Sequence, residues 1–194
     1  MNATRVQAVL DFWFLPEDHP GNGAYRVAWF RKDDAFDAAI RAGFGADVEA
    51  ALSGAACQGT ARALLARIVL LDQFTRNIFR NTARAFAGDA QALALARMLV
   101  AAGRDKNLSA WQRWFAYLPF EHSESLLDQE RSVALFAGLC REVQNDAFNT
   151  AYDYAVRHRE VIARFGRFPH RNAILGREST AAEIAFLDQP GSSF

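Results

Sequence analysis

Residues 60–80 read TARALLARIVLLDQFTRNIFR and follow the period of a long α-helix. On a helical wheel, large aliphatic and aromatic side chains occupy almost every direction. A helix without a wide polar face is surrounded by the rest of its protein, so we expect the segment from Leu65 to Phe79 to be the most buried helix. The sequence therefore predicts a central helix around which the remaining chain packs.

The segments on both sides of this helix also have a helical period and lack the alternation that is typical of strands. Glycine and proline mark several expected ends: Gly43 and Gly45 separate two short helices, Pro119 ends another, and Gly166 follows a fourth. We predict an all-α fold, a single compact domain over residues 1–194 that is more than about half helical. The expected helices, about nine in number, cover residues 6–14, 33–43, 46–53, 60–80, 88–102, 109–118, 123–144 and 146–165 and a last segment from Thr180 onward.

Charge and composition limit the class of partner. The chain has 22 Lys and Arg residues and 22 Asp and Glu residues, so its formal net charge is zero. Proteins that bind nucleic acids rely on excess positive charge, so we expect no nucleic-acid partner. No apolar run approaches the roughly 20 residues of a membrane span, and no signal peptide is recognisable. Cys57 and Cys140 lack metal or redox spacing and are expected to be buried thiols, which together with these features predicts a cytoplasmic protein without membrane association.

Five polar residues interrupt the apolar central helix near its carboxyl end: Asp72, Gln73, Arg76, Asn77 and Arg80. At 100° per residue they fall within an arc of about 140°, in line with apolar residues one and two turns earlier, so the arc points at least partly inward. One interpretation is structural, an Asp72–Arg76 ion pair at positions i and i+4 that stabilises the helix. The other is a functional site, since the two amides add hydrogen-bonding groups that an ion pair does not need.

A second polar cluster reads EHSE at residues 121–124, after Pro119. Capping of the following helix explains the serine and the acids, including Glu124, because anionic groups stabilise a helix amino terminus. His122 is not explained in this way. It is therefore a candidate for a chemical role.

A third polar cluster extends from residue 158 to residue 180 and repeats the Arg-Asn pair of the central helix as Arg171 and Asn172. His170 precedes this pair. Arg177 lies just before an expected helix start at Thr180, where free backbone N–H groups favour an anion. The alternative is that a carboxylate of the chain itself, from the capping-box residue Glu183, already accepts hydrogen bonds from these groups.

Metal binding and covalent catalysis have little support. His122, Glu124, His158 and His170 are potential metal ligands, but no HExxH or comparable spacing is present. No GxSxG motif appears, and neither cysteine has a histidine at a spacing typical of a catalytic pair. We expect no metal and no bound cofactor.

Three ordered motifs resemble those of a bacterial family, domain-of-unknown-function family 924. They read LDQFTRNIFR at residues 71–80, PFEHSE at 119–124, and FGRFPHRN at 165–172 followed by LGREST at 175–180. The resemblance covers nearly the whole chain, with one departure at Thr75, where the family usually has proline. The family's fold is described as tetratricopeptide-like, which implies a superhelix of antiparallel helix pairs. The resemblance implies no established activity.

Two functional interpretations from different classes remain open. In the first, the three clusters converge on a pocket that binds a small anionic or carboxylate-bearing ligand, either as a binding protein or as an enzyme with His122 or His170 as its proton carrier. In the second, a tetratricopeptide-like surface binds a peptide or protein. Buried motif residues favour the pocket, and motif residues along an open groove favour the peptide.

The predicted ligand-binding set draws on all three clusters: Asp72, Gln73, Arg76, Asn77, Arg80, His122, Glu124, His170, Arg171, Asn172 and Arg177. Arg76 and Arg171 are the expected charge partners of the ligand, because a guanidinium group binds anions through two parallel hydrogen bonds. The alternative is a polar core in which Asp72, Glu124 and other internal carboxylates already pair with both arginines.

Overall fold

The computed structural model describes residues 1–54 and 59–192. The chain is 70% helical, and the described residues contain no strand, which confirms the all-α prediction. Within these described ranges, eight helices form a single compact domain. The α-helices are α1 (Ala3–Phe14), α2 (Asp34–Leu52), α3 (Ala61–Ile68), α4 (Thr75–Ile78), α5 (Asp89–Ala101), α6 (Ala110–Glu121), α7 (Leu126–Glu142), α8 (Asp146–Phe165) and α9 (Ala181–Leu187). A π-helical segment, Val69–Phe74, joins α3 to α4 without a break, so these three form one helix, called the central helix below.

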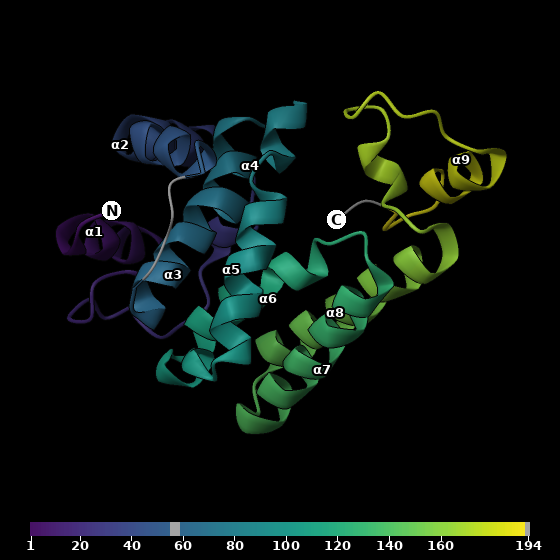
Figure 1. The fold of residues 1–194 in the computed structure, drawn as a ribbon. Helices are drawn as coiled ribbons and strands as arrows, with labels where there is room; N and C mark the ends of the chain where they lie inside the picture. The colour runs from purple at the N-terminus through teal and green to yellow at the C-terminus, as the bar shows by residue number, and fades with distance from the viewer. Residues whose placement is uncertain (55–58, 193–194) are drawn as a thin grey trace.

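The central helix is the most enclosed part of the structure, as its sequence predicts. Leu65, Ile68, Val69, Leu71 and Phe74 are all completely buried. In Figure 1, α1 and α2 lie on one side of this helix and α5 and α6 on the other. The apolar side chains of these helices continue into those of α7 and α8 as one hydrophobic core.

The prediction of two short helices at residues 33–43 and 46–53 was wrong, because α2 continues through both glycines. Ile40, Phe44 and Val48 are spaced four residues apart, and all three are buried on the core side of α2. A glycine inside a helix costs about 1 kcal/mol relative to alanine. Burial of this apolar stripe outweighs that cost, which reduces the helix count to eight.

Pro119 does not end its helix, contrary to the prediction from the sequence. It lies inside the last turn of α6, and the backbone N–H of His122 still donates to Leu118 O at 2.9 Å. Proline removes a single backbone donor, and near a helix end few later hydrogen bonds depend on it. The extra turn carries Glu121 and His122 toward the central helix.

Helices α7 and α8 pack side by side as a hairpin, and α9 lies beyond the end of α8 (Figure 1). A tetratricopeptide-like repeat of such pairs stays a prediction. None of the described helices is long and apolar enough to cross a membrane. Cys57 lies outside the described residues, and Cys140 is partly exposed instead of buried.

Candidate functional site

A cavity of about 700 Å³ opens between the central helix, the carboxyl end of α6, the first half of α8 and the loop before α2. One wall is polar and consists of Gln73, Arg76, Asn77, Arg80, Glu121, His122 and His158. The rest of the lining is mainly aromatic and includes five residues, called the aromatic wall below: Tyr25, Trp29, Phe30, Trp114 and Tyr154. Five of the residues in the predicted ligand-binding set therefore line one cavity: Gln73, Arg76, Asn77, Arg80 and His122.

The π-helical segment positions the polar wall. A π turn widens the helix by one residue, and such bulges occur frequently at functional sites. Asp72 and Gln73 lie within this segment and are 0% and 7% exposed. Thr75, at the site where the resembling family has proline, is completely buried, and its hydroxyl donates to Leu71 O at 2.7 Å. This side chain thus occupies a position at which the helix changes its hydrogen-bonding pattern.

Gly88 allows α5 to begin directly against the central helix. A Cβ atom on this residue would lie 2.2 Å from the carbonyl oxygen of Leu71, so no larger residue fits without a shift of the backbone. The close approach brings the next residue, Asp89, to the polar wall. Asp89 has no signal in the sequence, because its role depends on this contact between two helices.

Asp72 accepts hydrogen bonds from several groups of the polar wall. Its Oδ1 atom lies 2.7 Å from Nδ1 of His122 and 3.4 Å from Nη1 of Arg76, and its Oδ2 atom accepts from Gln73 Nε2 at 2.6 Å. Burial alone raises the pKa of Asp72, but the interactions with His122 and Arg76 outweigh it and lower the pKa to about 2. Asp72 is therefore ionised at neutral pH.

The ionised Asp72 determines the proton position on His122. Burial and the nearby charge of Arg76 lower the pKa of His122 below its usual value, so the ring is neutral at pH 7. Because a carboxylate accepts hydrogen bonds only, Nδ1 carries the proton and Nε2 is the basic nitrogen. This is the arrangement in which a carboxylate orients a histidine for proton transfer.

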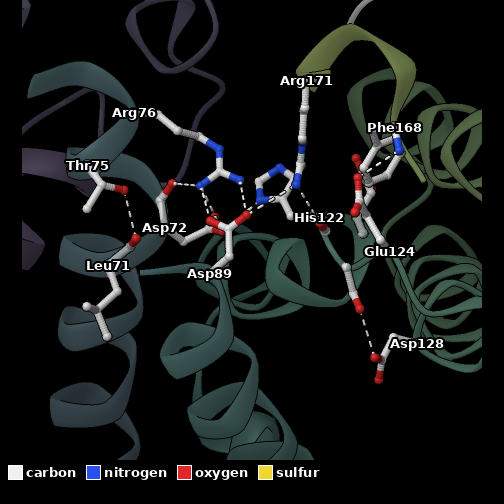
Figure 2. A network of polar contacts seen from close by, with 12 residues as sticks. Leu71, Asp72, Thr75, Arg76, Asp89, His122, Glu124, Asp128, Phe168 and Arg171 are labelled. Carbon is white, nitrogen blue, oxygen red and sulfur yellow. Dashed lines mark hydrogen bonds and ion pairs between the residues drawn. The ribbon is translucent and has the colours of Figure 1, made fainter. Parts of the chain in front are cut away.

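Arg76 and Arg171 come together on Asp89, as Figure 2 shows. Arg76 binds the two carboxylate oxygens of Asp89 at 2.8 and 3.1 Å, while Arg171 contacts it at 3.3 Å and also donates to His122 O at 3.1 Å. Both guanidinium groups lie over the ring of Phe86. Burial and the charge of Arg76 lower the pKa of Arg171 to about 10, so it stays charged. The two predicted charge partners are thus close neighbours with internal carboxylate partners.

Asn77 and Arg80 share another carboxylate, that of Asp37 in α2. Asn77 donates to Asp37 Oδ1 at 2.7 Å, and Arg80 binds the same carboxylate through Nε and Nη2. Burial raises the pKa of Asp37, but the hydrogen bonds from Arg80 and Asn77 outweigh it and lower the pKa below its ordinary value. Arg76, Arg80 and Arg171 thus each have a carboxylate partner within the protein. The acids responsible are mainly Asp37 and Asp89, which the sequence did not indicate.

Glu124, Asn172 and Arg177 form a separate cluster that does not line the cavity. Arg177 binds both oxygens of Glu124 at 2.7 and 3.0 Å and donates to Asn172 Oδ1 at 2.9 Å, and the backbone N–H of Phe168 donates to Glu124 at 2.8 Å. These contacts attach the segment before α9 to the start of α7.

Replacing Glu124 by glutamine is expected to loosen this attachment. The amide loses the ion pair with Arg177, a charged contact of about 1.5–3 kcal/mol. Backbone amides of residues 166–180 are then expected to exchange with deuterated water faster than in the wild type. Glu178→Gln is the matched control, because Glu178 is exposed in the same segment. Equal exchange in the two variants would show that the Glu124 contacts do not hold the segment.

His170 also lies outside the cavity lining. Its ring packs against that of Phe168, with ring centres 5.6 Å apart. Burial and the charge of Arg171 lower the pKa of His170 to about 4, so it is neutral near pH 7. At the start of α9, both hydrogen bonds of the Thr180–Glu183 capping box are present, so Glu183 occupies the proposed anion position. Of the two histidines considered as proton carriers, His122 is the one in the cavity.

Glu121 is the main acidic residue of the cavity that is absent from the predicted ligand-binding set. It is 5% exposed at the end of α6. Burial and the negative charge of Asp72 raise the pKa of Glu121 to about 8. Its position beside His122 was visible in the EHSE motif, but capping explained the acids of that motif sufficiently. Among the described residues, no group of three or more His, Cys, Asp or Glu side chains is placed to hold a metal ion.

Comparisons with known proteins agree with the motifs. A family model described as a bacterial protein of unknown function (DUF924) matches residues 9–191. Among solved structures, the protein of unknown function ATU0120 from Agrobacterium tumefaciens is similar, with 34% sequence identity and a TM-score of 0.75 over 96% of this chain and 98% of that chain. No curated protein matches. The matched range includes the central helix, α6 and α8, and therefore every element that builds the polar wall.

Proposed function

The chain belongs to the bacterial family of unknown function DUF924, and we propose that its cavity binds a small molecule with a carboxylate group on an aromatic or apolar body. The observation that carries the proposal is the lining of the cavity, which combines buried polar groups with a cluster of aromatic side chains. Its volume of about 700 Å³ lies within the range of about 300–1,000 Å³ that is typical of small-molecule sites.

The polar wall retains hydrogen-bond donors beyond those used within the protein. Arg80 binds Asp37 through Nε and Nη2, and the described hydrogen bonds do not use its Nη1 atom. Arg76 uses Nη1 and Nη2, and the described hydrogen bonds do not use its Nε atom. The two side chains are 33% and 21% exposed. A ligand carboxylate is an additional acceptor for these donors, with Arg80 as the more accessible partner.

The aromatic wall supplies contact area for the rest of the ligand. Trp29 and Trp114 are 6% exposed, and the more exposed rings of Phe30 and Tyr154 extend this surface outward. Aromatic rings bind apolar groups through large, rigid surfaces. This surface favours a flat or apolar ligand body over a strongly hydrated one.

Burial of the motif residues favours a pocket over a peptide groove. Gln73 and Asn77 are 7% and 8% exposed, although both line the cavity. A peptide would contact side chains distributed along an open surface. A small molecule fits a cavity in which the polar groups are recessed.

The proposal is tested by closing the cavity with one bulky side chain. Thr150 lines the cavity from α8 and is exposed, so Thr150→Trp is expected to fill the space without disturbing the core. We expect roughly 10 mM 3-phenylpropionate to raise the Tm of the wild type by about 3–5 °C, which corresponds to a Kd near 1 mM. The Thr150→Trp variant should show almost none of this increase.

Asp153→Trp is the matched control, because Asp153 is exposed on the same helix and does not line the cavity. It should respond to the ligand like the wild type. Carboxylate binding in this cavity would be refuted if no aryl carboxylate raised the Tm of the wild type. It would also be refuted if the two tryptophan variants responded equally to the ligand.

A further inference from the structure

Glu121 differs from the other buried acids of the described chain in having no cationic side chain beside it. Each of the others lies within 4.0 Å of an arginine or lysine nitrogen: Asp37, Asp72, Asp105, Asp128 and Glu183. The Glu121 carboxyl group instead lies beside His158, whose Nδ1 atom is 3.4 Å from Oε1. Glu121 nevertheless lines the cavity while being 5% exposed.

His158 does not supply the positive charge. Its Nδ1 atom lies 2.8 Å from Tyr154 O, an acceptor, so this nitrogen carries the proton of a neutral ring. Burial is the main reason why the pKa of His158 is lowered to about 3. At neutral pH the contact with Glu121 is therefore one between uncharged groups.

A buried carboxyl group of this kind favours a cationic partner. An isolated buried carboxylate is strongly disfavoured, and a positive charge in direct contact removes most of that penalty. The nearby charge of Asp72 acts in the same direction, since its negative potential attracts cations. Asp146, in the first turn of α8, adds a further acid to the cavity lining.

We propose that Glu121 binds a protonated amino group of the ligand, so that the cavity accepts small amines and, with a carboxylate at Arg80, amino acids with an aromatic or apolar side chain. The inference rests on the proposed role of the cavity as a ligand site. The aromatic wall supports it, because aromatic rings such as those of Trp29 and Trp114 attract cations as well as apolar groups. Glu121 would thus be the residue that distinguishes an amine from a neutral ligand.

Three probes with the same phenyl ring separate the two charged contacts: 2-phenylethylamine carries only the amine, 3-phenylpropionate only the carboxylate, and phenylalanine both. Titration calorimetry at pH 7 should show that the wild type binds all three. In Glu121→Gln, the affinity for the amine and for phenylalanine should fall at least about tenfold, the usual effect of losing a charged hydrogen bond. The affinity for 3-phenylpropionate should change less than about twofold.

Two further variants serve as controls. Glu160→Gln removes the same charge from an exposed position of α8 outside the cavity lining and should leave all three affinities unchanged. Glu121→Asp keeps the carboxyl group and should retain part of the amine affinity. If Glu121→Gln does not fold, the aspartate variant and the probe series on the wild type still provide the test.

The outcomes separate the two proposals. If 3-phenylpropionate binds but the amine does not, or if the amine binds Glu121→Gln as tightly as the wild type, amine recognition by Glu121 is refuted and carboxylate binding stands. If the amine binds in a Glu121-dependent way but 3-phenylpropionate does not bind, amine recognition is supported and the carboxylate proposal is refuted. Failure of all three probes to bind would refute both.

Discussion

Replacement of Asp72 by asparagine is expected to lower the free energy of unfolding by about 3–5 kcal/mol, the effect of breaking a buried ion pair by removing one partner. Asp72 is completely buried and ionised, and it lies within contact distance of His122, Arg76 and Gln73. An asparagine keeps the shape but removes the charge and turns one acceptor into a donor. Urea denaturation of the variant and the wild type measures the difference.

The matched control for this change is Glu49→Gln. Glu49 forms an ion pair with Arg84 at 2.7 Å, but their side chains are 56% and 54% exposed. Exposed pairs contribute about 1 kcal/mol or less, so the control should be nearly neutral. A similarly small loss for Asp72→Asn would contradict the role of Asp72 as the centre of the polar wall.

Replacement of Glu121 by glutamine is expected to stabilise the protein at alkaline pH. In the folded protein the pKa of Glu121 is raised to about 8, whereas in the unfolded chain this carboxyl group has its ordinary pKa of about 4.5. Between these values the folded state holds the proton more tightly, so stability falls as pH rises from about 4.5 to about 8. Glutamine does not titrate, so Glu121→Gln should match the wild type near pH 4 and exceed it by about 3–5 kcal/mol at pH 9.

The pH dependence of urea denaturation tests this expectation, and Glu160→Gln is again the control. An exposed acid has no large difference in environment between the folded and unfolded states, so its removal should leave the pH profile almost unchanged. The free energy of unfolding of the wild type should fall relative to that of Glu121→Gln between pH 5 and pH 8. If it does not, Glu121 is ionised in the folded protein over this range.

Much of the fold follows from the sequence because it depends on burial. The apolar pattern of residues 60–80 identifies the central helix, since a helix with that composition is stable only when enclosed. The interruptions at Gly43, Gly45 and Pro119 misled the prediction because tertiary packing outweighed local preference. The π-helical segment has no sequence signature of its own, so its effect on Asp72 is visible only in the structure.

The site was predictable in part. The polar residues of the central helix and His122 stand out because they interrupt apolar surroundings. All of them except Asp72 line one cavity, and Asp72 contacts His122. The position of Asp89 depends on the close approach of α5 to the central helix at Gly88. Asp37 lies in α2, 40 residues before its partner Asn77 in the sequence. Neither acid therefore has a local sequence signal. The aromatic wall was not predicted because large aromatic residues usually belong to the core. Phe30 is an exception, because it is 50% exposed and therefore does not belong to the core.

A crystal structure of the protein grown with 3-phenylpropionate tests carboxylate binding in the cavity most directly. The predicted result is electron density for the phenyl ring against Trp29 and Trp114, with the carboxylate within hydrogen-bond distance of the guanidinium group of Arg80 or Arg76. Density for the probe elsewhere on the surface, or a ring in the cavity whose carboxylate contacts neither arginine, would contradict it.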